Sequence, residues 1–278
     1  MPEAVSLLAG RRIRVWDFPI RLFHWLLVAA IAVAFLSAEE DSPLNRWHMV
    51  SGWVAAVLIF FRIVWGFVGG EHARFSGLLQ GGGLWHHVRE MLSLKPQATV
   101  GHNPLGWIAS LLLIIVSAAT IWTGALIVLS AGEAGEGLHS SIGWGLLALI
   151  ALHVAAVLLM SALTRDNLVR AMVAGSKSAD RQPDSTDARS PAIWAYLIGV
   201  TAVAVAIFGI LGVDPKAFLP RTTEATEHGA IESGERQSGE SRPVSGETEM
   251  ETTTESSMRT LIVPRIHLSA VVTERNYL

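Results

Sequence analysis

The chain has 278 residues, of which 51% are hydrophobic and 16% charged, and its formal net charge at pH 7 is −3. With this composition we expect a membrane domain joined to a polar segment, and no nucleic-acid partner. The absence of cysteine excludes disulfides, cysteine-ligated iron–sulfur clusters and covalently attached c-type haem, so any redox cofactor needs other ligands.

Five apolar stretches are each long enough to cross about 30 Å of hydrocarbon at about 1.5 Å per residue. The predicted spans are residues 16–38, 47–68, 104–129, 140–163 and 192–213. The first is not a cleavable signal, because the acidic "SAEEDSP" follows its apolar core instead of a small-residue cleavage site. We therefore predict an all-α integral membrane protein, with a four-helix bundle and a fifth membrane helix in one domain over residues 1–213.

The distribution of Lys and Arg predicts the orientation of these spans. Basic residues precede the first span and follow the second and fourth, whereas "SAGEAGEG" before the fourth contains none. We expect the protein in a bacterial inner membrane. The positive-inside rule then places the N-terminus in the cytoplasm and, after five spans, the C-terminus in the periplasm. Tryptophans at span ends are expected to form interfacial belts, and these are Trp16, Trp47, Trp65 and Trp107.

Two long segments lie outside the spans. Residues 69–103 form a connection on the predicted inner side, and its "LWHHVREMLSL" portion fits an amphipathic helix on the membrane surface. Residues 214–278 form an acidic tail. From Arg221 to Thr260 it is rich in Glu, Ser, Thr and Gly and poor in large apolar residues, so we expect it to be largely disordered.

Four histidines fall within or at the ends of the predicted spans, where an imidazole is costly and indicates a functional site. His48 and His139 begin inward-running spans at the outer surface. His24 lies 14 residues before the outer end of the first span, and His153 lies 14 residues after His139, so both are about 21 Å deep. Fourteen residues fall only about 40° short of four helical turns, so His139 and His153 share a face. Two imidazoles at each of two depths suit two haems, each ligated axially from both sides.

Neighbouring residues favour haem over other cofactors. "HMVSGW" and "HSSIGW" place Gly52 and Gly143 one turn beyond the outer histidines, where the lack of a side chain lets a flat macrocycle approach the helix. Arg62 lies 14 residues after His48 on the same face, and its buried guanidinium needs an anion such as a haem propionate.

Other roles for the histidines are less favoured than haem ligation. Single intramembrane histidines often serve only helix packing, but four at paired depths disfavour this. A proton relay would need a deep acid, and the only acid in the spans is Asp17 at the inner edge. A zinc site would gather its ligands at one point, not at two levels.

Several motifs together resemble the bacterial cytochrome b561 and nickel–iron hydrogenase b-type cytochrome family. They are "RVWDFPIRLFHW", "HMVSGW", "FRIVWGFVGGEHARF", "GHNPLGW" and "LHSSIGW", and the resemblance covers about residues 12–170. It implies a four-helix cytochrome with two haem b groups that moves electrons between quinone and a redox partner protein. It also implies that the haem-iron ligands are His24, His48, His139 and His153.

The resemblance does not decide whether the redox partner is a hydrogenase-like enzyme or a c-type cytochrome. It also does not decide whether the chain is a component of a quinone oxidoreductase. Quinone is expected at the inner surface near His72, Arg74, His102 and Asn103, although His102 or Asn103 also fits a helix cap. The alternatives are a haem-containing membrane anchor or assembly subunit of an oxidoreductase, and a proton-coupled transporter without haem.

Overall fold

The computed structural model describes residues 11–39, 41–76, 104–130, 135–178 and 186–221. Its elements are β1 (Arg12–Arg14), α2 (Phe18–Leu36), η1 (Asn45–Trp47), α3 (His48–Val68), α6 (Pro104–Ser130), α7 (Glu136–Thr164), α8 (Leu168–Ala174), β2 (Ser176–Ser178) and α9 (Ile193–Val213). Helices α2, α3, α6, α7 and α9 are long and apolar enough to cross a membrane, and their ends lie within four residues of the predicted spans. The prediction of an all-α membrane protein is confirmed.

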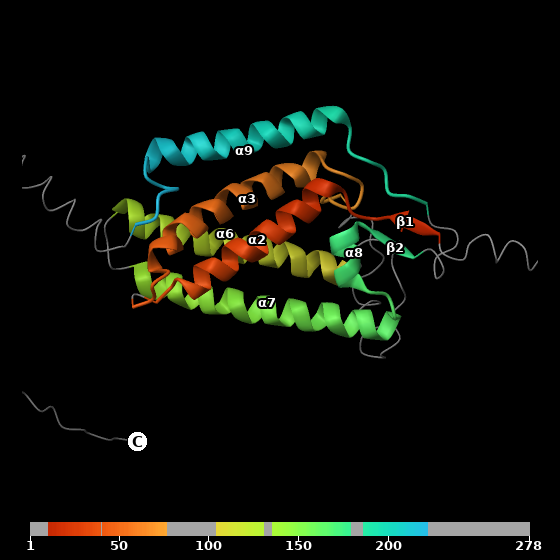
Figure 1. Ribbon diagram of the computed structural model, residues 1–278, viewed down its shortest axis with the longest axis horizontal. Coiled ribbons are helices and arrows are strands. Elements are labelled where there is room, and N and C mark those ends of the chain that lie inside the picture. The colour runs from red at the N-terminus through yellow and green to blue at the C-terminus, as the bar shows by residue number, and fades with distance from the viewer. Residues whose placement is uncertain (1–10, 40, 77–103, 131–134, 179–185, 222–278) are drawn as a thin grey trace, which may run out of the picture. The chain divides into compact units, whose positions relative to one another are not determined.

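The five long helices alternate in direction, so each end of the bundle gathers residues distant in sequence (Figure 1). We call the end with β1, β2 and α8 the sheet end, and the other the η1 end. At the sheet end Asp17, which caps α2, accepts hydrogen bonds from Ile20 N (2.9 Å), from Trp65 Nε1 near the end of α3 (3.3 Å) and from Gly70 N (3.0 Å). One carboxylate therefore satisfies the N-terminus of α2 and joins it to the end of α3.

Helix α3 is central to the packing, with close backbone contacts to α2, α6 and α9. On α9 the small buried residues Ala195, Gly199 and Ala202 face α3, and a Cβ on Gly199 would lie 3.0 Å from the Trp65 ring. This face of small residues therefore allows α9 to pack closely against α3. By contrast, α7 packs against α6 and α8 and makes little close backbone contact with α2 or α3.

The sheet end contains two elements that the sequence pattern did not predict. Strands β1 and β2 pair antiparallel, with Arg12 opposite Ser178 and Arg14 opposite Ser176. Helix α8 ends at Gly175, which adopts φ +78° and accepts hydrogen bonds on its carbonyl from Val15 N and Trp16 N. Three-residue strands carry too little periodicity to recognise in sequence, and their pairing joins segments more than 160 residues apart.

The predicted tail begins as part of the bundle at the η1 end. Asp214 is 6% exposed, and it accepts a hydrogen bond from Trp53 Nε1 (3.0 Å) and pairs with Arg221. The Arg221 backbone N–H donates to the carbonyl of Arg46 (3.1 Å). Residues 214–221 thus fold back onto α3, because a buried carboxylate and its cation need each other. Residues 222–278, the remainder of the predicted tail, lie outside the described residues.

The four tryptophans predicted to form interfacial belts differ in their exposure. Trp47 is 39% exposed, whereas Trp16, Trp65 and Trp107 are buried. Trp65 hydrogen-bonds Asp17 and stacks on Phe61, and Trp107 contacts Phe75 edge-on. Trp65 and Trp107 therefore contact other parts of the protein, through Asp17 at the start of α2 and Phe75 after α3.

Candidate functional site

The imidazoles of His48 and His139 face each other at the η1 end of the bundle. Their ring centroids are 6.1 Å apart and the ring planes are nearly perpendicular, at 89°. His48 is the first residue of α3, and His139 lies in the first turn of α7. The structure therefore brings together two histidines separated by 91 positions, on helices that hardly touch each other directly.

Both rings are held by hydrogen bonds at the same nitrogen. His48 Nδ1 lies 2.9 Å from the carbonyl of Ala34 in α2, and His139 Nδ1 lies 3.0 Å from the carbonyl of Thr120 and 3.1 Å from Thr123 Oγ1 in α6. Because a carbonyl can only accept, each Nδ1 carries the proton and each Nε2 keeps a free lone pair. This tautomer and this anchoring are what metal-ligating histidines require.

The spacing of the two rings would fit a metal held between them. A metal–imidazole bond is about 2.0–2.1 Å and a ring nitrogen lies roughly 1.1 Å from its ring centre, so two imidazoles that share one metal would have centroids up to about 6.3 Å apart. The 6.1 Å between His48 and His139 agrees with this value. The donor set also fits haem, since two neutral imidazoles complete the coordination that a porphyrin leaves open.

The glycines near this pair leave room beside it. A Cβ on Gly52 or on Gly143 would meet nothing within 4 Å, although both lie one turn beyond a histidine in a helix facing the bundle. Gly124 in α6, by contrast, lies directly against the pair, because a Cβ there would lie 2.9 Å from His139 Cε1. Its missing side chain lets α6 support the back of the imidazole.

The deeper pair is His24 on α2 and His153 on α7. The two are close enough for their charges to interact electrostatically. His24 Nδ1 is buried and has no hydrogen-bond partner in the described part of the chain, which is an uncommon state for a polar atom. The indole of Trp25 contacts the His24 ring edge-on at 5.1 Å.

Arg62 is 4% exposed inside α3, toward the sheet end. Its guanidinium carbon lies 5.0 Å from the centre of the Phe75 ring, and it interacts electrostatically with Asp17. Nη1 has no hydrogen-bond partner among the described residues. A buried guanidinium N–H in this state calls for an acceptor, and a carboxylate such as a haem propionate fits it.

Several supporting groups carry no signal in the sequence. The carbonyls of Ala34 and Thr120 leave no trace in side-chain patterns, since every residue has a carbonyl. Thr123 and Gly124 are ordinary residues of an apolar helix until α7 is placed beside them. Only Asp17 carries a signal, as an acid at a span start followed by Pro19, which is typical of a helix N-terminus.

The segment predicted to contact quinone is described only in part. Arg74 Nε donates to the carbonyl of Gly69 (2.8 Å), and the His72 ring contacts Trp16 edge-on. Burial lowers the pKa of His72 below its usual value, nearby Lys177 adds to this, and Glu71 opposes it. Burial therefore favours the neutral form of the His72 imidazole, which can still form hydrogen bonds. His102 and Asn103 lie outside the described residues.

The described residues offer no suitable site for a bare metal ion. Nowhere in them do three or more His, Cys, Asp or Glu side chains form a group that could hold one. The paired histidines thus suit a cofactor that brings its own equatorial ligands.

Comparison with known proteins identifies the family. The model of the prokaryotic cytochrome b561 family matches residues 15–175, which include all four intramembrane histidines. Among curated relatives, a probable Ni/Fe-hydrogenase B-type cytochrome subunit of Azotobacter vinelandii is 33% identical, over 37% of this chain and 54% of the relative. A probable Ni/Fe-hydrogenase 1 B-type cytochrome subunit of Escherichia coli K12 is 28% identical, over 40% of this chain and 57% of the relative.

A third relative, a probable Ni/Fe-hydrogenase B-type cytochrome subunit of Bradyrhizobium diazoefficiens, is 23% identical over 59% of this chain and 85% of its own length. The chain spans about half the length of the first two relatives. No solved structure matches it. Since the family match covers more than half of the sequence and the helices it requires are present, the chain belongs to the prokaryotic cytochrome b561 family.

Proposed function

We propose that this protein is an electron-carrying membrane cytochrome with two haem b groups, one ligated by His48 and His139 and the other by His24 and His153. The observation that carries the proposal is the outer pair: two imidazoles 6.1 Å apart, each with Nδ1 hydrogen-bonded to a backbone acceptor. Family membership supports haem b, and the absence of cysteine agrees with noncovalent attachment.

The bound haems would supply reversible one-electron chemistry, and the chain would supply ligation, orientation and electrostatics. The Ala34 and Thr120 carbonyls would increase the basicity of the outer ligands. Gly52 and Gly143 would admit the macrocycle, and Arg62 would hold a propionate of the deeper haem. The two ligand levels are about 21 Å apart along the helices, so the haems together would carry electrons across the bilayer without moving an ion through hydrocarbon.

The proposed electron route joins quinone at the sheet end to a redox protein at the η1 end. His72 supports the first part, because its neutral imidazole lies at the sheet end and offers a hydrogen-bond partner to a quinone head group. The names of the relatives favour a hydrogenase-like enzyme over a soluble c-type cytochrome as the partner. Arginines at the sheet end support a cytoplasmic location for that end, in a bacterial inner membrane.

Single substitutions of the four histidines test the ligation. The measurements are low-temperature difference spectra and electron paramagnetic resonance. His48→Ala and His139→Ala should lose or convert one haem. His24→Ala and His153→Ala should lose or convert the other haem. His72→Ala, a histidine outside the spans, should keep both haems. Four unchanged spectra, or a shared phenotype for His24→Ala and His48→Ala, would contradict the assignment.

A second function, a membrane anchor whose haem is only structural, is favoured by one observation: the relatives carry the names of subunits of an enzyme. Rapid mixing of the purified protein with a quinol analogue separates the two functions. An electron carrier should be reduced at both haems, while an anchor should stay oxidised.

A further inference from the structure

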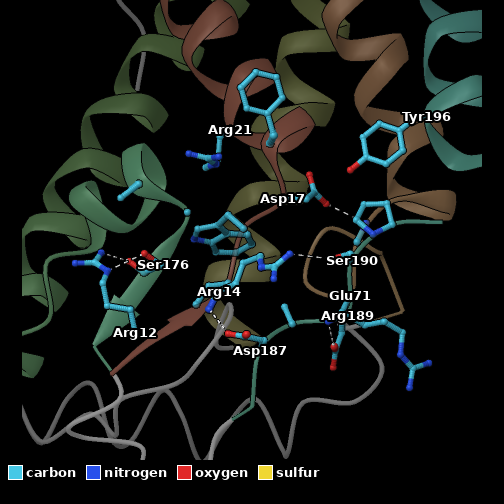
Figure 2. Close-up of a pocket in the computed structure, with 18 residues that line it drawn as sticks. Arg12, Arg14, Asp17, Arg21, Glu71, Ser176, Asp187, Arg189, Ser190 and Tyr196 are labelled. Carbon is cyan, nitrogen blue, oxygen red and sulfur yellow. Dashed lines mark hydrogen bonds between the residues drawn. The ribbon is translucent and has the colours of Figure 1, made fainter. Parts of the chain in front are cut away.

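A cavity of about 490 Å³ opens at the sheet end, where α2 and α9 begin and α3 ends (Figure 2). Four arginines line it: Arg12 and Arg14 from β1, Arg21 from the first turn of α2, and Arg189 from the segment before α9. Its size is that of a small-molecule site, and it lies at the level where two apolar spans start. None of the histidines or other residues proposed for haem lines it.

Within the described residues, the hydrogen bonds of these arginine side chains go to neutral acceptors. Arg12 donates to Ser176 Oγ and the Ser176 carbonyl, and Arg14 to Ser190 Oγ (3.0 Å). Arg21 Nη1 donates to a carbonyl at the end of α8, while its Nε is buried without an acceptor in the described part of the chain. No carboxylate among the described residues forms an ion pair with any of these guanidinium groups.

The acids lining the cavity are occupied by N–H groups. Asp17 accepts from Gly70 N and Trp65 Nε1, Asp187 from the backbone N–H of β1 (2.7 Å), and Glu71 from a backbone N–H before α9 (2.8 Å). Carboxylates held in this way position the loops around the cavity, and among the described residues they do not neutralise the guanidinium groups by ion pairing.

The start of α9 adds to the attraction for an anion. Its N-cap residue is Ala192, which provides no side-chain hydrogen bond to the first turn. The positive end of a 21-residue helix is therefore uncapped beside Ser190 and Pro191, which line the cavity. An anion bound among the arginines would lie within the field of this helix.

The surroundings of the cavity are those of a lipid headgroup. The adjoining span-start residues Phe18, Ile193 and Trp194 are 62%, 79% and 51% exposed, so apolar side chains meet the arginine-lined wall at the membrane surface. A ligand that fits both surfaces has an anionic head and hydrocarbon chains. Basic pockets between membrane helices on the cytoplasmic side bind such headgroups.

We propose that the arginine-lined cavity binds the phosphate headgroup of an anionic phospholipid. The phosphodiester lies between Arg14 and Arg21, with Arg12 and Arg189 at the rim, and the acyl chains leave past the start of α9. The bound lipid ties β1, α2 and the segment before α9 together at the sheet end.

Native mass spectrometry of the full chain in a nonionic detergent tests this proposal. The protein is incubated separately with dioleoyl phosphatidylglycerol, dioleoyl phosphatidylcholine or inorganic phosphate. We expect it to retain phosphatidylglycerol and neither of the others, and retention should weaken about fivefold for each of Arg14→Gln and Arg21→Gln. Arg46→Gln, which removes an exposed arginine at the η1 end, is the matched control and should retain lipid as the wild type does.

Equal retention of phosphatidylcholine would show general lipid binding, and retention of inorganic phosphate at comparable strength would show a free-phosphate site. Either result overturns the proposal, as does equal weakening in Arg46→Gln. If Arg21→Gln fails to fold because α8 loses its hydrogen bond, retention of phosphatidylglycerol by Arg189→Gln tests the site instead. Its side chain is exposed and makes no hydrogen bond to the described residues, so unchanged retention in that variant would count against the site.

Discussion

Gly124→Ala is the substitution for which the structure allows the sharpest calculation at the outer histidine pair. The new Cβ would lie 2.9 Å from His139 Cε1, whereas ordinary carbon contacts begin at about 3.4 Å, so the imidazole must retreat by about 0.5 Å. A shift of that size lengthens the 3.0 Å bond from His139 Nδ1 to the Thr120 carbonyl to the limit of a hydrogen bond. Loss of such a supporting bond typically lowers metal affinity about 10-fold or more, or about 1.4 kcal/mol.

The same substitution should not weaken the polypeptide itself, because alanine is favoured over glycine inside a helix by about 1 kcal/mol. Haem titration of the apoprotein, followed by low-temperature spectroscopy, should show weaker binding of one haem and an unchanged second. Gly145→Ala on α7 is the control, since a Cβ there meets nothing within 4 Å, and it should bind both haems normally. Unchanged binding of both haems in Gly124→Ala would refute the role given to His139.

Three further predictions concern charge. Arg62→Leu should lower the midpoint potential of the deeper haem and leave that of the outer haem almost unchanged, because a nearby cation favours the electron-richer reduced state. Equal shifts of both potentials in a potentiometric titration would show that Arg62 does not pair with a propionate of the deeper haem. Burial lowers the pKa of His72 from 6.5, so the folded protein binds fewer protons than the unfolded chain below that pH. Its thermal midpoint should therefore fall as pH drops through about 6.5 toward the lowered pKa, and His72→Gln should reduce this slope. Asp214→Asn should leave Arg221 buried without its counter-ion and cost about 3 kcal/mol of stability, seen as a lower thermal midpoint, whereas the exposed Asp41→Asn should have little effect.

The sequence by itself was sufficient to predict the membrane helices and to place His48 at the same level of the bundle as His139. A run of apolar residues must span the bilayer as a helix because no other structure satisfies its backbone there. A fixed rise of about 1.5 Å per residue then converts sequence position into depth, and this conversion places His48 level with His139.

Tertiary structure alone decided which groups support and surround these side chains. The acceptors for His48 and His139 are carbonyls of α2 and α6, and a carbonyl has no sequence signature. The arginine-lined cavity gathers β1 with a segment more than 170 positions away, and the packing of Asp214 against Trp53 joins residues 161 positions apart. Sequence periodicity describes one helix at a time, whereas these contacts depend on how separate segments meet at the ends of the bundle.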